Sequence, residues 1–96
     1  MMFTEKIREL REARQMPQRQ FAAALEIDTA TYCKIEKGER RVKREQIPII
    51  AKLLKTNQKE LLILWLAEQV VEVLEKDKKV SDKVLDIAKE KLKKQI

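Results

Sequence analysis

The stretch QRQFAAALEIDTATYCKIEKGER, residues 18–40, decides the fold of this 96-residue chain. Its apolar spacing predicts one short helix from Gln18 to Leu25. Asp28 is a strong N-cap for a second helix of about Thr29 to Lys37. Gly38 then supplies the positive φ with which a helix commonly ends. The stretch therefore predicts two short helices joined by a tight turn.

The second of these helices has two different faces when it is projected at 100° per residue. Thr31, Tyr32 and Ile35 share one side, which we expect to face the core. The opposite side carries small residues near its amino end and cations toward its carboxyl end: Thr29, Ala30, Cys33, Lys34 and Lys37. Cys33, a single thiol, is interpreted as a small inert residue rather than a redox sensor.

Caps and apolar periods predict four more helices, at about Thr4 to Gln15, Glu45 to Leu54, Asn57 to Leu74 and Asp82 to Gln95. Thr4, Asn57 and Ser81 are the expected N-caps. The longest helix is apolar all round as far as Ala67, which predicts that its first half is buried. Beyond Ala67 its apolar residues keep an arc of about 160°, which is too wide to leave in water.

The composition excludes most kinds of chemistry. One Gly and two Pro argue against an all-β fold, whereas 44% apolar and 40% charged residues suit one helical bundle. With no His and one Cys, the chain lacks the commonest general base and cannot form a thiolate metal cage. We therefore expect no enzyme, no metal, no cofactor and no small-molecule substrate. The longest apolar run, residues 61–67, is far below the roughly 20 residues of a membrane span, and a cytoplasmic protein without a membrane partner is expected.

The charge of the chain favours a polyanionic partner. The net charge is +6, and the pI is about 9.6. Residues 34–44 contain six cations against two acids, and residues 78–96 contain seven lysines against three acids. Residues 58–77 lie between them and are net acidic. This distribution suggests a basic binding loop, a scaffold helix and a further basic surface, although a lysine-rich tail is most often only a solvated helix face.

The motif of residues 18–40 resembles the helix-turn-helix of lambda-repressor-like, Xre-type regulators. The resemblance covers about residues 3–65 and rests on Gln18, Ala22, Ile35-Glu36-Lys37-Gly38 and Ile50-Ala51-Lys52-Leu53-Leu54. It implies an all-α, five-helix DNA-binding bundle, to which this chain adds an extended fifth helix and a C-terminal helix. The chain has Glu26 and Lys55 where the family commonly has Gly, and Pro17 where a Ser or Thr cap is common.

The resemblance and the helix projection together assign the DNA contacts. Thr29, Ala30 and Lys34 are the expected base readers, because a hydroxyl, a methyl and an ammonium suit base edges in the major groove. The expected DNA-backbone contacts are Gln18, Lys37, Arg40, Arg41, Lys43 and Arg44. Each of these three residues also has a purely structural interpretation. Thr29 would only be tolerated at the start of the helix, Ala30 would only be a small residue without a contact, and Lys34 would be a solvated surface cation.

Two further positions have structural interpretations. The resemblance implies that Arg11 and Glu36 form a largely buried ion pair between the first and third helices. Trp65 is expected in the core or in an interface, because its neighbours are apolar.

The sequence divides into a DNA-binding domain at residues 1–77 and a C-terminal helix at residues 78–96, which is expected to dimerise. The predicted dimer interface is Leu66, Val70, Val73, Leu85, Ala88 and Leu92. The predicted function is that of a sequence-specific, double-stranded-DNA-binding regulator, a dimeric repressor or a restriction-modification controller. The alternative is a DNA-binding antitoxin or interaction protein whose C-terminal helices bind a protein partner.

Overall fold

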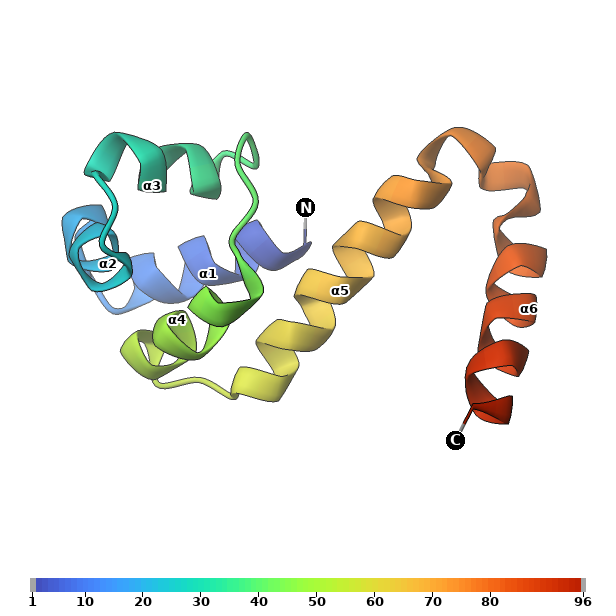
Figure 1. The fold of residues 1–96 in the computed structure, drawn as a ribbon. Coiled ribbons are helices and arrows are strands. Elements are labelled where there is room, and N and C mark those ends of the chain that lie inside the picture. The colour runs from blue at the N-terminus through green and yellow to red at the C-terminus, as the bar shows by residue number, and fades with distance from the viewer. Residues whose placement is uncertain (1, 96) are drawn as a thin grey trace.

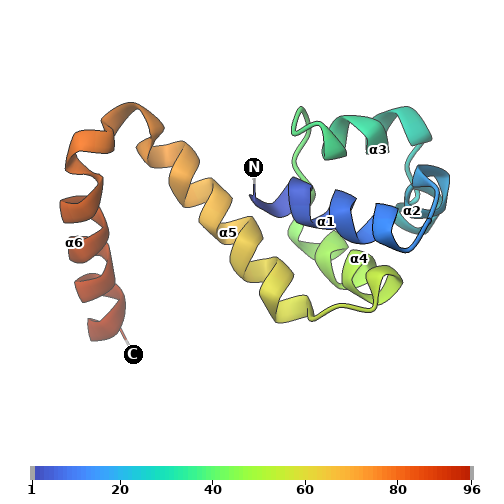
Figure 2. The same ribbon diagram turned by 180° about the vertical axis from the view of Figure 1, so that it is seen from behind.

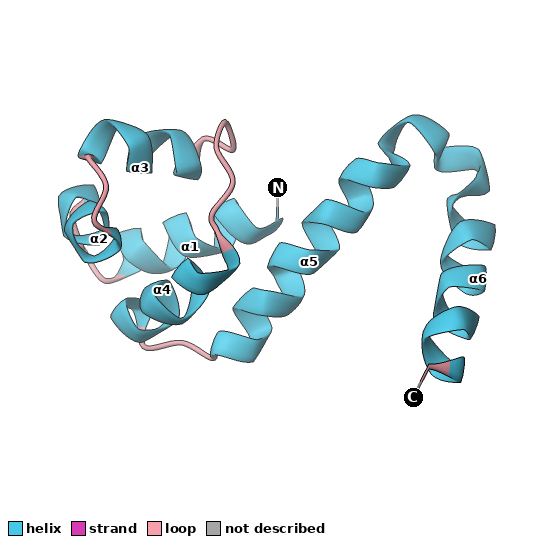
Figure 3. Ribbon diagram, viewed as in Figure 1, coloured by secondary structure: helices cyan, strands magenta, loops and turns pink. Residues whose placement is uncertain are grey.

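The computed structural model describes residues 2–95, and these residues form helices without a strand (Figures 1 and 3). The elements in chain order are α1 (Met2–Ala13), α2 (Gln18–Leu25), α3 (Thr29–Glu36), the 3-10 turn η1 (Arg44–Gln46), α4 (Ile47–Leu54), α5 (Gln58–Leu74), the 3-10 segment η2 (Glu75–Val80) and α6 (Ser81–Lys94). The predicted all-α fold, with an extended fifth helix and an additional last helix, is confirmed.

One apolar core joins α1 to α4 and the start of α5. Its buried side chains are Phe3, Ile7, Phe21, Ala22, Leu25, Tyr32, Ile35, Val42, Ile47, Ile50, Ala51, Leu54 and Leu61. Figures 1 and 2 show these helices packed together, while the end of α5 and all of α6 lie to one side. The core therefore fixes α2 and α3 without any contribution from α6.

Side-chain caps begin two of the predicted helices. The N–H of Thr31 donates to Asp28 Oδ1 at 2.6 Å, and the N–H of Glu60 donates to Asn57 Oδ1 at 3.0 Å. Each bond satisfies a backbone donor that the first turn of a helix leaves without a partner. The predicted starts of α3 and α5 are thus confirmed.

Left-handed residues end three of the helices. Gly38 has a φ of 79° after α3, while Glu26 after α2 and Lys55 after α4 have φ values of 58° and 52°. A side chain with a Cβ is strained in this region by about 1 kcal/mol, so Glu26 and Lys55 adopt the conformation that Gly would adopt more easily. Gln15 at 53° is a fourth such position that the sequence analysis did not anticipate.

The predicted start of the first helix was wrong. α1 begins at Met2, and Thr4 is buried inside it with 7% of its surface exposed. The N–H of Phe3 donates to Glu68 Oε1 on α5 at 3.0 Å. A carboxylate from a distant helix thus occupies the amino end of α1, where it also opposes the positive end of the helix dipole.

Two expectations for the C-terminal part were also wrong. Along the first half of α5 only Leu61 is buried, whereas Ile63 and Leu66 are 55% and 41% exposed, because no other element of residues 2–95 covers that side. Ser81 does not cap α6, since its Oγ donates to the carbonyl of Lys78 at 2.8 Å. The chain enters α6 through η2, in which Asp77 leaves helical geometry with φ −127° and ψ 39°.

Candidate nucleic-acid interface

The outward face of α3 carries the predicted base readers. Thr29, Ala30 and Lys34 are all exposed, while Tyr32 and Ile35 on the other side are 0% and 2% exposed. The projection of this helix is therefore confirmed, and α3 lies along one edge of the bundle (Figure 1). A short helix presented in this way can enter a major groove with its amino-terminal half against base edges.

A buried ion pair fixes the orientation of α3 on α1. Arg11 Nε lies 2.7 Å from Glu36 Oε2, and Arg11 Nη2 donates to Glu36 Oε1 at 2.9 Å. Arg11 Nη1 also donates to the carbonyl of Met16 at 2.9 Å, and this bond links α1 to the turn before α2. The two charged side chains are only 14% and 3% exposed. The pair links α1 to α3, as the resemblance implied, and the bond from Arg11 to Met16 adds the turn before α2.

The electrostatics of this cluster favour the charged pair. Burial by itself would raise the pKa of Glu36, but hydrogen bonds from its partners, chiefly Arg11, outweigh burial and hold that pKa below its ordinary value. The hydrogen bond to Glu36 likewise raises the pKa of Arg11. Burial raises the pKa of the Tyr32 phenol, and Glu36 raises it further. Arg11 and Glu36 thus stay charged at neutral pH, while the phenol of Tyr32 stays neutral. The ring of Tyr32 stacks on Phe21 with 5.5 Å between their centroids.

Gln18 belongs to the same cluster, which the sequence analysis did not foresee. Its Nε2 donates to Glu36 Oε1 at 3.1 Å, and its side chain is half-buried at the start of α2. Its predicted contact with a phosphate stays a prediction. To make that contact through Nε2, the amide would use its second N–H or exchange Glu36 for the phosphate.

The loop between α3 and η1, together with the first residue of η1, carries most of the predicted DNA-backbone contacts. Its cations are all exposed: Lys37, Arg40, Arg41, Lys43 and Arg44. Arg41 is paired with Glu72 of α5, and both side chains are about half exposed. The other four have no ion-pair partner among residues 2–95. The loop therefore presents a row of exposed positive charges beside the carboxyl end of α3.

α5 holds this loop at its middle. Trp65 Nε1 donates to the carbonyl of Val42 at 2.9 Å, and the side chain of Val42 is 2% exposed. Trp65 packs on the core, as predicted. Val42, Glu68 and Glu72 are positioning residues that the sequence analysis missed. The available signal was a lone valine in the basic run RRVKR, residues 40–44, because an apolar side chain there needs a buried site.

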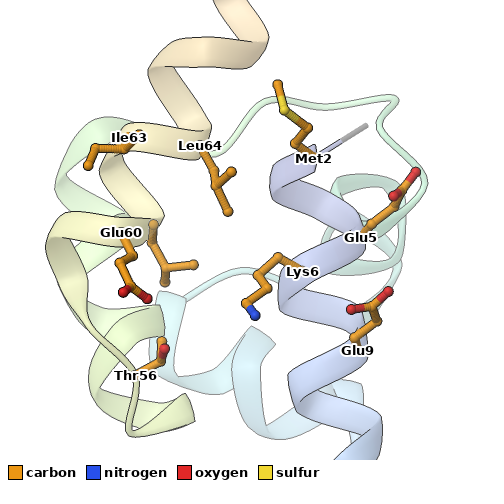
Figure 4. A pocket seen from close by; sticks show the side chains of 9 residues that line it. Met2, Glu5, Lys6, Glu9, Thr56, Glu60, Ile63 and Leu64 are labelled. Carbon is orange, nitrogen blue, oxygen red and sulfur yellow. The ribbon is translucent and has the colours of Figure 1, made fainter.

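A groove between α1 and the start of α5 has the wrong charge for DNA. It encloses about 510 Å³, and Figure 4 shows Glu5, Glu9 and Glu60 around it together with Lys6. Carboxylates outnumber cations there, so a polyanion would be repelled. The side of the bundle that carries this groove therefore does not suit nucleic acid.

The predicted dimer residues are only partly brought together in one chain. Leu66, Val70 and Val73 lie on α5 with 41%, 44% and 76% of their surface exposed. On α6, Leu85 is half-buried, whereas Ala88 and Leu92 are exposed. α6 packs mainly on η2 and diverges from α5 (Figures 1 and 2). We expected α6 to cover part of the apolar stripe of α5 within one chain. Among the predicted α6 residues, only Leu85 lies against α5 in this way.

The described residues define a class: a helical bundle with an outward-facing short helix after a tight turn, followed by a basic loop. A family model described as a helix-turn-helix domain matches residues 3–62, which is more than half of the chain. The chain belongs to the helix-turn-helix domain family, and this supports a DNA-binding regulator. No curated protein and no solved structure matches it.

No helix within residues 2–95 is long and apolar enough to cross a bilayer. Those residues also contain no cluster of three or more His, Cys, Asp or Glu side chains arranged to hold a metal ion.

Proposed function

We propose that the protein is a sequence-specific transcription regulator of the lambda-repressor-like, Xre type. It binds double-stranded DNA as a homodimer in the cytoplasm and catalyses no reaction. The observation that carries the proposal is the exposure of Thr29, Ala30 and Lys34 on a helix whose other side is locked into the core. The buried Arg11–Glu36 pair supports it, because specific readout requires a rigidly oriented helix.

Base recognition follows from the chemistry of the three exposed side chains. Lys34 can donate to O6 and N7 of guanine, the hydroxyl of Thr29 can bond to a base, and the methyl of Ala30 suits a thymine methyl. A well-placed hydrogen-bonding contact to a base contributes about 1–3 kcal/mol of discrimination. These residues select a sequence and contribute less to affinity for random DNA.

Affinity follows from the basic loop. Lys37, Arg40, Lys43 and Arg44 reach toward phosphates on both sides of the groove that α3 enters. Arg41 can join them by leaving Glu72, because an exposed ion pair contributes only about 0–1 kcal/mol. Each neutralised phosphate adds about −0.9 to the slope of log affinity against log salt concentration.

Selectivity requires two copies. One recognition helix reads only a few base pairs, and two helices related by a two-fold axis double the contacts and fix the spacing of two half-sites. A dimeric repressor or a controller of a restriction-modification operon has this form. The second candidate function is an antitoxin or interaction protein that covers α5 and α6 with a different protein. The exposed apolar residues of those two helices favour it as the alternative.

Selection from random DNA duplexes tests the function directly. The expected result is an enriched palindrome whose half-sites lie about 10 bp apart, bound with a steep negative salt slope. Lys34→Ala on α3 should weaken binding to the enriched sequence. Its charge-matched control is Lys52→Ala on α4, which should leave the affinity for DNA unchanged, because α4 lies across α1 from α3 in Figures 1 and 2. A salt slope near zero, or no enriched sequence, would show that α3 does not read DNA.

A further inference from the structure

The single chain exposes more surface than a folded monomer of its size. A monomeric protein of 11.4 kDa exposes about 5,800 Å², whereas this chain exposes 7340 Å². Its radius of gyration of 15.5 Å likewise exceeds the roughly 12.5 Å of a compact chain of this length. The excess of about 1,500 Å² is close to the area that one subunit buries in an obligate homodimer, about 1,000–2,500 Å².

Most of the large apolar side chains that the chain exposes lie toward its carboxyl end. Nine of the eleven large apolar side chains exposed in residues 2–95 belong to the segment from α5 to α6. These nine are Ile63, Leu66, Val70, Val71, Val73, Val80, Val84, Ile87 and Leu92. α6 has 14 residues, and helices of that length are marginally stable in water unless another element packs on them. This segment therefore needs a partner that the chain does not supply by itself.

A cleft between α5 and α6 marks where that partner binds. The two helices diverge as a V on either side of η2 (Figures 1 and 2). The cleft encloses about 710 Å³ and is lined by Val70, Val71 and Leu74 of α5 and by Leu85 of α6. Three carboxylates and one lysine also line it, so the charged part of the lining is net acidic; the remaining lining residues are Glu68, Glu72, Glu75, Lys78, Met2 and Ser81.

α6 has the chemistry that fits this cleft. It carries Lys83, Lys89, Lys91, Lys93 and Lys94 against three acids. By contrast, residues 66–77 of α5 and η2 carry four acids against one lysine. Val84, Ile87 and Leu92 of α6 remain exposed, so this helix still has an apolar face to bury. An acidic, apolar cleft and a basic, amphipathic helix within one sequence are complementary between two copies.

We infer that the cleft of one copy binds α6 of a second copy, and that the second copy returns the same contact. The inference rests on the proposed homodimer and specifies how it forms: α5 and α6 of both chains make a four-helix bundle around a two-fold axis. Each acidic α5 then faces the basic α6 of the other chain. The contact is isologous, so it closes at two copies.

A charge exchange between two full-length variants tests this arrangement. One variant carries Glu75→Lys in the cleft and Asp77→Lys beside it, which leaves the Arg41–Glu72 pair intact, and the other carries Lys89→Glu and Lys91→Glu on α6. Alone, each variant opposes like charges across both copies of the contact, which should weaken its dimer at least tenfold. In an equal mixture each contact regains opposite charges, so sedimentation should show dimers restored at micromolar concentration. The matched control, Lys52→Glu with Lys55→Glu on the far side of the bundle, should stay dimeric.

Three results would overturn the inference. The intact protein could sediment as a monomer at micromolar concentration, the single variants could dimerise as well as the parent, or the mixture could fail to restore dimers. Far-UV circular dichroism on each variant and on the mixture checks that the helices of the core remain folded. Selection from random duplexes is scored separately. A monomer that still enriches a sequence rejects this interface alone, and a dimer that enriches none rejects the DNA function alone.

Discussion

Removing Arg11 should expose how strongly one buried charge depends on its partner. In Arg11→Ala, Glu36 keeps a side chain that is 3% exposed and loses both of its guanidinium bonds. Breaking a buried pair from one side typically costs about 3–5 kcal/mol. Because Gln18 still donates to Glu36 at 3.1 Å, we expect a loss of about 2–4 kcal/mol in the free energy of unfolding at pH 7.

The loss of unfolding free energy in Arg11→Ala should depend on pH, and the pKa of Glu36 sets the direction of that dependence. In the parent protein the pKa of Glu36 is lower in the folded state than in the unfolded state. Its contribution to stability is therefore present above the unfolded value of about 4.3 and disappears as the pH falls through the folded value. Without Arg11, burial dominates and raises the pKa of Glu36, so the folded variant takes up a proton more readily. The difference in stability between parent and variant should therefore shrink from pH 7 to about pH 4.

Urea unfolding followed by circular dichroism, at several pH values, measures this difference. Arg8→Ala is the matched control, because Arg8 pairs with Glu12 at 3.7 Å on the exposed side of the same helix. Such a surface pair should contribute less than about 0.5 kcal/mol. A loss below about 1 kcal/mol for Arg11→Ala, or a loss that does not change between pH 7 and pH 4, would refute the reasoning.

Three further predictions concern the reading of DNA bases, a buried hydroxyl and backbone strain. Lys34→Ala should lose about 1–3 kcal/mol on the best DNA site and relax the preference at one base position, whereas Lys43→Ala should weaken all sequences alike; equal losses on selected and random DNA would contradict the base-reading role. Tyr32→Phe should leave the free energy of unfolding unchanged or raise it by up to about 1 kcal/mol, because the buried hydroxyl lies near Glu36 but makes no hydrogen bond of good geometry within residues 2–95; a loss above about 1 kcal/mol would show that it is bonded to Glu36. Lys55→Gly should raise thermal stability by about 1 kcal/mol, because φ at this residue is 52°, and an unchanged melting temperature would argue against strain there.

The features that the sequence predicted correctly are those with local causes. Asp28 and Asn57 each bond to a backbone N–H three residues later, so the cap and its target lie within one turn. The outward position of Lys34 follows in the same way from the 100° step of a helix. The end of a helix at Glu26 also depends only on neighbouring residues, and there the turn kept its geometry although Gly was absent.

The features that the sequence did not predict depend on distant partners. Glu68 caps α1 from 65 residues away, and Arg41 meets Glu72 across 31 residues. No local pattern distinguishes these carboxylates from others on the same acidic helix. Ser81 failed as a cap for a similar reason, because the 3-10 segment before it gave its hydroxyl a carbonyl acceptor, that of Lys78.

The bond between Trp65 and Val42 has a practical consequence. Trp65 is the single tryptophan of the chain, and its indole N–H is bonded to the backbone of the basic loop. Its fluorescence therefore reports the environment of one place, where α5 meets the basic loop. A shift of the emission maximum on adding duplex would register movement of that loop without any attached dye. An unchanged emission spectrum on dimerisation would show that the loop keeps its contact with Trp65 when α6 binds the second copy.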